Sequence, residues 1–235
     1  MSERFTGFPL GTRDFYKDLI KHNNREWFAK NKPFYKDRIL PAAQVLVQDL
    51  GERLREIAPG IIADSRLNGA GSIFRIYRDI RFSPDKSPYK TFLGILWWQG
   101  SGKKFENSGF YFHLEHDRLT LYAGINSFSP NKLDLYRQYV LQEDHGQALK
   151  DIIANLEAQG YQIGGEQYKR VPRGYDKEHP HADLLLYKGL HAGLPGPIPD
   201  EFYAVDLVDI CFDHFRNMAP LHHWLHQMLE SNPPA

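Results

Sequence analysis

The residues best suited to bind a ligand are gathered in one short segment, from Ser72 to Lys90. Five cations and two acids occur there, which leaves an excess of about three positive charges in a chain whose formal net charge is zero. A guanidinium grips a phosphate or carboxylate with two parallel hydrogen bonds, and an ammonium adds point charge. The segment therefore predicts an anion-binding site. Its cations are Arg75, Arg78, Arg81, Lys86 and Lys90.

A structural role for the same segment is the alternative. Asp79 and Asp85 could pair with the arginines, and acids from the helices could complete an internal ion-pair network. In favour of a ligand, Pro84 and Pro88 restrict the backbone and lower the cost of ordering the loop. Three aromatic rings could stack on a base or sugar. These rings belong to Tyr77, Phe82 and Tyr89.

A second basic stretch, from Lys169 to Pro180, repeats the composition of the first. It carries Arg170 and Arg173 together with prolines and a tyrosine. Two such loops at the ends of strands could close over one site. The alternative is a pair of unrelated, solvated loops.

The histidines are weaker indications of chemistry. His179 and His181 alternate with Pro180 before Asp183, a spacing that could ligate a metal. The proline and the following leucines instead favour the start of a helix with Asp183 in its first turn. His222 and His226 lie four residues apart and are expected on an exposed helix face. We expect no metal and no cofactor, and no nucleophile elbow, Walker loop or dinucleotide fingerprint occurs.

Composition limits the class of protein. A chain of 235 residues suits one domain, and a net charge of zero argues against coating nucleic acid by bulk electrostatics. The single cysteine, Cys211, fits a reducing compartment and lies in an apolar run that predicts a buried, inert thiol. No signal peptide and no membrane span is visible, so we expect a cytoplasmic protein without a membrane partner.

Apolar periodicity predicts helices at both ends of the chain. Thr12 is expected to cap the first helix, Asn23 or Asn24 the second, and Pro33 to open a third. Ser129 and Pro130 are expected to start another helix. The expected helices are a short one from Thr12, then 25–31, 33–58, one from 129, 146–159, 200–217 and 220–231.

The middle of the chain alternates in polarity and predicts strands. A hairpin is expected around His116 and Asp117, a bulge or turn at Gly164 and Gly165, and an irregular connector over 193–199. The fold class is therefore α+β: an antiparallel sheet of about four to six strands flanked by N-terminal and C-terminal helices. We expect a single domain, 1–235, with a helical part at about 12–58, a sheet core at about 72–190 and terminal helices at about 200–231. The expected strands are 72–79, 91–99, 109–115, 118–125 and 161–171.

Four blocks of sequence resemble a conserved family described only as a domain of unknown function. The most specific is the central one, Phe74-Arg75-Ile76-Tyr77-Arg78-Asp79 continuing through Arg81-Phe82-Ser83 to Lys86-Ser87-Pro88-Tyr89-Lys90. The resemblance covers nearly the whole chain and departs at Leu186, where similar sequences often carry an arginine. The other blocks are Asn23–Phe28 with Lys32, Tyr35 and Pro41; Ala123-Gly124 with Pro130, Leu133 and Arg137; and Arg170, Pro172, Gly174, His179-Pro180, Asp183–Leu185 and Lys188.

The resemblance implies no activity, but it groups further residues with the central segment. Arg137, Arg170, His179 and Lys188 enter through their blocks, whereas Arg173 is added from local charge. Glu26 also falls in a matched block. If the protein is an enzyme, which the sequence leaves undetermined, His179 or Glu26 is the expected proton-transfer group.

Three classes of function follow. The first is binding of a small anionic, phosphate-bearing ligand by the predicted site. The second is a nucleic-acid-binding module, against which the neutral net charge counts. The third is a non-catalytic interaction or structural protein with an internal arginine–carboxylate network. Oligomeric state is not predicted. The predicted ligand-binding residues are Arg75, Arg78, Arg81, Lys86, Tyr89, Lys90, Arg137, Arg170 and Arg173.

Overall fold

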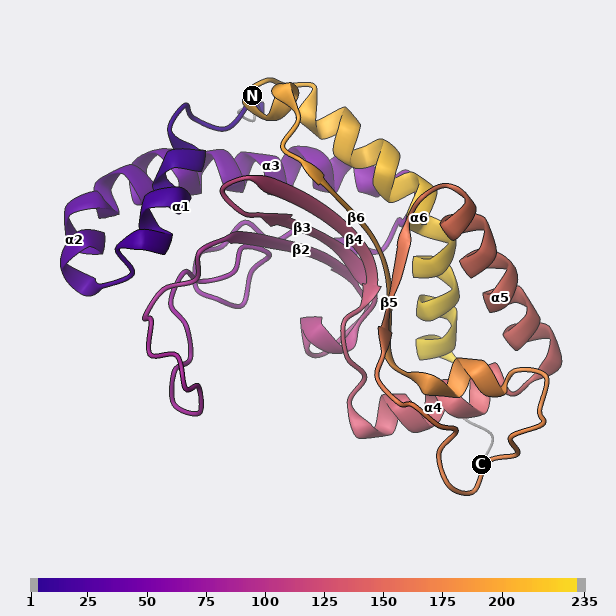
Figure 1. Ribbon diagram of the computed structural model, residues 1–235. Coiled ribbons are helices and arrows are strands. Elements are labelled where there is room, and N and C mark those ends of the chain that lie inside the picture. Colours follow the sequence, from indigo (N-terminus) through magenta and orange to yellow (C-terminus); the bar gives the residue numbers. More distant parts are fainter. Residues whose placement is uncertain (1–3, 232–235) are drawn as a thin grey trace. The chain divides into compact units, whose positions relative to one another are not determined.

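The computed structural model describes residues 4–231 and has an α+β architecture, with an antiparallel six-stranded sheet and helices from both ends of the chain (Figure 1). The predicted class and strand number are thus confirmed. The strands follow the order β1-β2-β3-β4-β6-β5. Their bounds are β1 Ile61–Ile62, β2 Leu93–Gln99, β3 Gly109–Leu114, β4 Arg118–Ile125, β5 Gln162–Glu166 and β6 Tyr187–Pro197.

The N-terminal helices begin close to their expected positions, but the first cap is different. Gly11, with a φ of 89°, takes the N-cap position, and the Thr12 hydroxyl donates to the Pro9 carbonyl at 2.7 Å. The Asn24 side chain does cap its helix, accepting from the Trp27 N–H at 2.9 Å. The helices are α1 Thr12–Lys21, α2 Arg25–Phe34 and α3 Leu40–Leu54, with the π-helix η1 Tyr35–Ile39 between the last two.

Pro33 does not open a new helix, contrary to expectation. It lies in the last turn of α2, and the chain continues through η1 into α3. Proline lacks the N–H that would complete the α-helical bond to Ala29, and a π-helical turn begins two residues later. One long helical run therefore replaces the two helices expected from the sequence.

The helices expected at the C-terminus were also wrong, again at a proline. The two helices expected over 200–217 and 220–231 are a short 3₁₀ turn, η4 Asp200–Tyr203, and one helix, α6 Leu207–Glu230, which passes through Pro220. Pro220 is exposed, so water can replace the hydrogen bond that its missing N–H would make. The remaining helical elements are α4 Pro130–Val140, α5 Glu143–Ala158, and the 3₁₀ turns η2 Lys104–Glu106 and η3 Ala182–Leu186.

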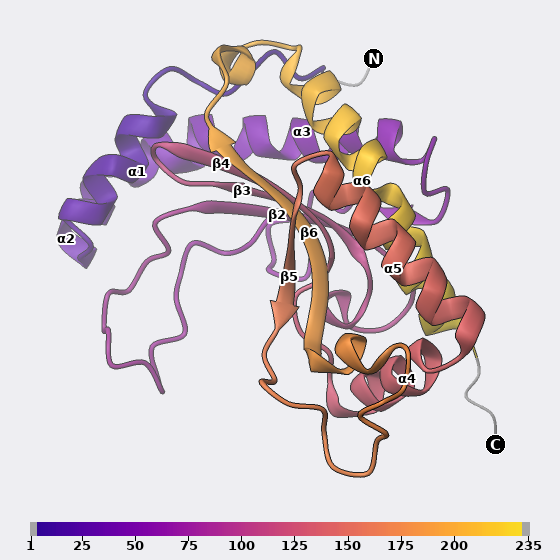
Figure 2. The ribbon, with the colours of Figure 1, turned by 45° about the vertical axis from the view of Figure 1, so that its right-hand side comes forward.

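The expected strand over 72–79 is not formed. Only two isolated antiparallel bridges occur there, Ile73 with Ile95 and Tyr77 with Tyr89. Alternation of side chains requires only an extended chain, whereas a strand also requires a partner in continuous register. Figure 2 shows the chain between β1 and β2 as a long irregular loop.

The expected connector over 193–199 is largely strand. Gly193 pairs with Gln162 in the antiparallel β5–β6 ladder, and the two strands run side by side in Figure 2. A β-carbon on Gly193 would lie 2.6 Å from the Tyr122 ring, so this glycine makes room for an aromatic side chain. The bulge expected at Gly164 and Gly165 is present, and Gly165 has a φ of 103°.

Contacts within the chain divide it into two compact units. Strands β2, β3, β4 and β6 contribute residues to both. The prediction of a single domain stays a prediction. Among the described residues the first unit comprises 4–97, 111–121 and 195–214, and the second comprises 98–110, 122–194 and 215–231.

The core of the first unit joins α3 to β2 and to the N-terminal segment. The fully buried Trp97 indole donates to the Val47 carbonyl of α3 at 2.9 Å. Asp49, also on α3 and only 7% exposed, accepts from the backbone N–H of Phe5 at 2.6 Å. A buried N–H without an acceptor is costly, so this carboxylate fixes where the N-terminal segment lies.

Replacing Asp49 tests this anchor. Asp49→Ala leaves the buried Phe5 N–H without its acceptor and should lower the free energy of unfolding by about 1–3 kcal/mol. Urea unfolding at neutral pH measures the change. Glu52→Ala is the matched control, since Glu52 lies on the same helix but is exposed and only pairs with Arg4 at 3.6 Å. Equal losses in the two variants would contradict the anchoring role.

Candidate functional site

Two of the five cations in the central segment are paired with its own acids. Arg78 forms an ion pair with Asp85, and Arg81 binds both oxygens of Asp79, at 3.0 and 2.7 Å. Hydrogen bonds from Arg81 lower the pKa of Asp79 to about 2, and hydrogen bonds from Ser87 and then Arg78 lower the pKa of Asp85. These two arginines therefore pair with the local aspartates, as in the structural role given above as the alternative to ligand binding.

The other three cations have no carboxylate partner among residues 4–231. The Lys86 ammonium donates to the Ile80 carbonyl at 3.0 Å, and the Lys90 ammonium donates to the Arg75 carbonyl at 2.7 Å. Arg75 is exposed, and its side chain passes over Gly69, where a β-carbon would lie 2.8 Å from Cδ. The charge excess noted in the sequence therefore resides on Arg75, Lys86 and Lys90.

The pKa of Lys90 reflects its burial and the positive charge beside it. Burial, and then the neighbouring charge of Arg75, lower the pKa of its ammonium below the ordinary value. The ammonium also lies 5.8 Å from the centre of the Phe74 ring. A half-buried cation beside a second cation is stabilised by any anion that approaches.

A pocket of about 730 Å³ adjoins these residues within the first unit. Arg78, Tyr89 and Lys90 of the predicted set line it, together with Asp79 and Asp85. The pocket is therefore bordered by one cation without a carboxylate partner and by one arginine already in an ion pair.

Asn23 holds the pocket segment to the N-terminal helices. Its side-chain amide donates to the Tyr89 carbonyl at 2.9 Å and accepts from the Tyr89 N–H at 3.1 Å. The Tyr89 ring is buried against Phe28, with ring centres 4.1 Å apart. Tyr89 thus anchors the segment, and Tyr77 and Phe82, 54% and 93% exposed, are the rings that face solvent. The sequence placed Asn23 in a matched block but assigned it only a capping role.

A row of aromatic and histidine side chains continues from Lys90. Phe74 stacks on Tyr111 at 5.2 Å, and the Tyr111 hydroxyl lies 3.1 Å from Nδ1 of His113. His113 packs on Phe92 at 4.4 Å, and burial lowers its pKa. Alternation along β3 places Tyr111 and His113 on one face, but only the tertiary structure places Phe74 beside them.

The remaining predicted ligand residues belong to the second unit. Arg170 and Arg173 are exposed and have no carboxylate partner among residues 4–231. Arg137 is half-buried on α4, and its guanidinium lies over the rings of Tyr168 and Tyr175. A single site formed jointly with the central segment stays a prediction.

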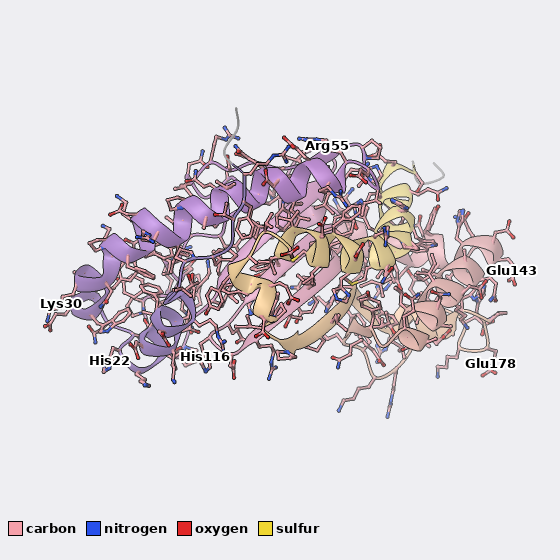
Figure 3. All side chains as sticks on the ribbon, turned by 90° about the horizontal axis from the view of Figure 1, so that it is seen from above. His22, Lys30, Arg55, His116, Glu143 and Glu178 are labelled. Carbon is pink, nitrogen blue, oxygen red and sulfur yellow. The ribbon has the colours of Figure 1, made fainter. Side chains whose placement is uncertain are left out.

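The two candidate proton-transfer groups have different surroundings. Glu26 is exposed and bonds Lys30 at 2.9 Å along α2, and Figure 3 shows Lys30 directed outward. His179 is half-buried, and its Nδ1 accepts from the backbone N–H of His181 at 3.1 Å. A catalytic role for either residue stays a prediction.

The expected exposed face at His222 and His226 is wrong for His222, which is 0% exposed. Its Nε2 lies 3.1 Å from the Gln99 carbonyl oxygen, which can only accept, so Nε2 carries the proton. Its Nδ1 then accepts from the Ser108 hydroxyl at 3.0 Å. The Gln99 amide also lies 2.9 Å from Nε2 of His226, completing a chain of four side chains. A buried polar chain has the same sequence spacing as an exposed face, which is why the sequence did not distinguish them.

Residues 4–231 contain neither a cluster suited to a metal ion nor a helix suited to crossing a membrane. No group of three or more His, Cys, Asp or Glu side chains is placed to hold a metal ion there. In the same range, every helix is too short or too polar to cross a lipid bilayer.

Comparison with known proteins identifies a family. A family model described as a conserved hypothetical protein (DUF2461) matches residues 11–224. The resemblance inferred from the sequence blocks is thereby confirmed. Neither the curated proteins nor the solved structures contain a match.

The buried histidine makes stability depend on pH. Burial, and then the charges of His223 and His226, lower the pKa of His222 to about 3, whereas an unfolded chain binds this proton near pH 6.5. The unfolded state therefore gains the proton first, and the free energy of unfolding falls as pH decreases from about 6.5 toward 3, by up to about 1.4 kcal/mol per pH unit. His222→Gln should reduce this slope in urea titrations.

His22→Gln is the control for this measurement. His22 is exposed, and its charge is not among the causes of the lowered His222 pKa, so its replacement should leave the slope near that of the unmodified protein. An unchanged slope in His222→Gln would show that His222 does not carry the effect.

Proposed function

Because the chain belongs to the DUF2461 family of conserved hypothetical proteins, whose description names no activity, we propose a function from the site itself: binding of an anionic, phosphate-bearing ligand in the first unit. The ligand's anionic group would be held by Arg75 and Lys90, and its body would occupy the adjoining pocket. A cytoplasmic setting, with its supply of phosphorylated small molecules, is part of the proposal.

The observation that carries the proposal is a half-buried lysine beside a second cation, with no carboxylate partner for either among residues 4–231. Lys90 donates to the Arg75 carbonyl, is half-buried, and has a pKa lowered by burial and by the Arg75 charge. A folded protein ordinarily offsets a partly buried cation with a carboxylate. Here no carboxylate among residues 4–231 does so, and a ligand anion would supply the missing charge.

Preorganisation of the segment supports binding. Asn23 fixes the Tyr89 backbone from both sides, and Lys86 bonds the Ile80 carbonyl across the loop. The Arg78–Asp85 pair joins the same two parts of the loop. A site that is ordered before binding loses less conformational entropy when the ligand arrives.

A single-stranded nucleic acid is the second candidate, favoured by one observation. Phe82 is 93% exposed, with the Arg81 guanidinium 5.8 Å from its ring centre, and Tyr77 is 54% exposed. Exposed rings beside cations can stack on bases. The net charge of zero counts against it, because such proteins bind largely through an excess of positive charge.

Calorimetric titration distinguishes these candidates. Inorganic phosphate, a nucleoside monophosphate and a short single-stranded oligonucleotide serve as probes. We expect the double variant Arg75→Gln, Lys90→Gln to weaken phosphate and nucleotide binding at least about tenfold, because both charge-assisted contacts are removed. Arg38→Gln is the control, an exposed cation of the same unit outside the pocket lining.

The outcomes are distinct. A folded double variant that binds phosphate as the unmodified protein does would refute the proposal. Binding of the oligonucleotide alone, with an affinity that falls steeply with salt, would favour the second candidate.

A further inference from the structure

Arg137 presents hydrogen-bond donors that the protein does not use. Its guanidinium carbon lies 5.3 Å from the centre of the Tyr168 ring and 5.7 Å from that of Tyr175. Its Nε is buried without an acceptor, and the guanidinium donates no hydrogen bond to any residue in the range 4–231. Cation–π contact with the two rings supplies no acceptor for any of its five N–H groups.

Local backbone structure places the two tyrosines. The N–H groups of Gln167 and Tyr168 both bond the Leu186 carbonyl, at 3.1 and 3.0 Å. Tyr175 follows a turn in which its N–H bonds the Pro172 carbonyl at 3.4 Å, with Gly174 at a φ of 90°. A glycine at this position permits the turn. The loop can therefore return Tyr175 to the guanidinium that Tyr168 also contacts.

The far end of the loop is held as firmly as its start. The Lys150 ammonium of α5 bonds the Pro180 carbonyl at 2.7 Å and the Asp183 carboxylate at 3.0 Å. From α4, the Tyr136 hydroxyl donates to the Leu184 carbonyl at 2.9 Å. The loop is thus tied to two helices, one of which carries Arg137, and the site needs little ordering when a ligand binds.

The loop itself carries an excess of cations. Four are found between residues 169 and 180, against two acids, and none has a carboxylate partner within 4–231. Of the two acids, Asp176 accepts from the Glu178 N–H at 2.9 Å, and Figure 3 shows Glu178 at the outer edge of the loop. The four cations are Lys169, Arg170, Arg173 and Lys177.

We propose that Arg137, whose guanidinium lies over the rings of Tyr168 and Tyr175, binds a second ligand, a small phosphate monoester. Its Nε is enclosed, so a ligand would meet the two Nη groups, whose parallel N–H bonds match two phosphate oxygens. A dianionic phosphate suits a loop with four cations better than a carboxylate does. Every residue used belongs to the second unit, and none of them lines the pocket described above.

Purely structural stacking is the alternative. In that case Arg137 only fastens the loop to α4, and either a lysine or an arginine would serve, since both stack on aromatic rings. A receptor requires the planar fork, which lysine lacks. Binding measured in Arg137→Lys therefore separates the two roles.

The experiment titrates phenyl phosphate and benzoate into the double variant Arg75→Gln, Lys90→Gln, so that the first proposed site does not contribute. We expect phenyl phosphate to bind more tightly than benzoate. Arg137→Lys and Arg137→Gln in this background should each weaken phenyl phosphate at least about tenfold. Arg216→Gln, an exposed arginine of the second unit, should leave the affinity unchanged.

Three results would overturn the proposal: no binding of phenyl phosphate in this background, equal affinity for benzoate, or an undiminished affinity in a folded Arg137→Lys variant. The first proposal is tested independently when its titrations are made in an Arg137→Gln background, where the second proposed site does not contribute.

A second measurement applies if the Arg137 variants do not fold. Phenylglyoxal modifies accessible guanidinium groups, and peptide mapping of the unaltered chain follows each arginine separately. Phenyl phosphate should slow modification of Arg137 and leave Arg216 unaffected. Equal rates at Arg137 with and without phenyl phosphate would refute the assignment.

Discussion

Removing a positive charge from water costs free energy, and this cost constrains both basic segments of this protein. A cation that leaves water must gain a counter-charge, hydrogen-bond acceptors or an aromatic face. Arg78, which is half-buried, gains a counter-charge from Asp85. Lys90 gains a backbone carbonyl and the Phe74 ring, and Arg137 gains two rings, but neither gains a carboxylate among residues 4–231. The sites proposed here are the places where this compensation is incomplete.

Several buried polar groups of the described residues find their partners within the chain. Asp49 binds a backbone N–H, and the Trp97 indole binds a carbonyl of α3. His222 is enclosed between a hydroxyl and an amide of suitable polarity. Other buried polar atoms lack such a partner: in the part of the chain that the structure describes, Nε of Arg137 is one of seven buried side-chain nitrogen and oxygen atoms without one.

Local signals in the sequence predicted much of the fold. Ser129 and Pro130 located α4, the His116 hairpin was found, and paired glycines identified the bulge in β5. The failures required information from distant residues. Alternation over 72–79 gave no sign that pairing stops at two bridges. Gly193 pairs in a strand and leaves room for the Tyr122 ring, a neighbour 71 positions away that the local sequence does not indicate. Proline was overinterpreted at Pro33 and Pro220, because helical context can outweigh one missing hydrogen bond.

The candidate sites were predictable in charge but not in pairing, since sequence alone cannot show which cations lack an acid.

The hydrogen bonds between Asn23 and Tyr89 add a kinetic consequence. They join residues 66 positions apart. Closing so long a segment is entropically costly until both ends are otherwise structured. The pocket should therefore mature late in folding, after the N-terminal helices have docked, and a nascent chain would acquire its ligand only after residue 89 has been synthesised and has met Asn23.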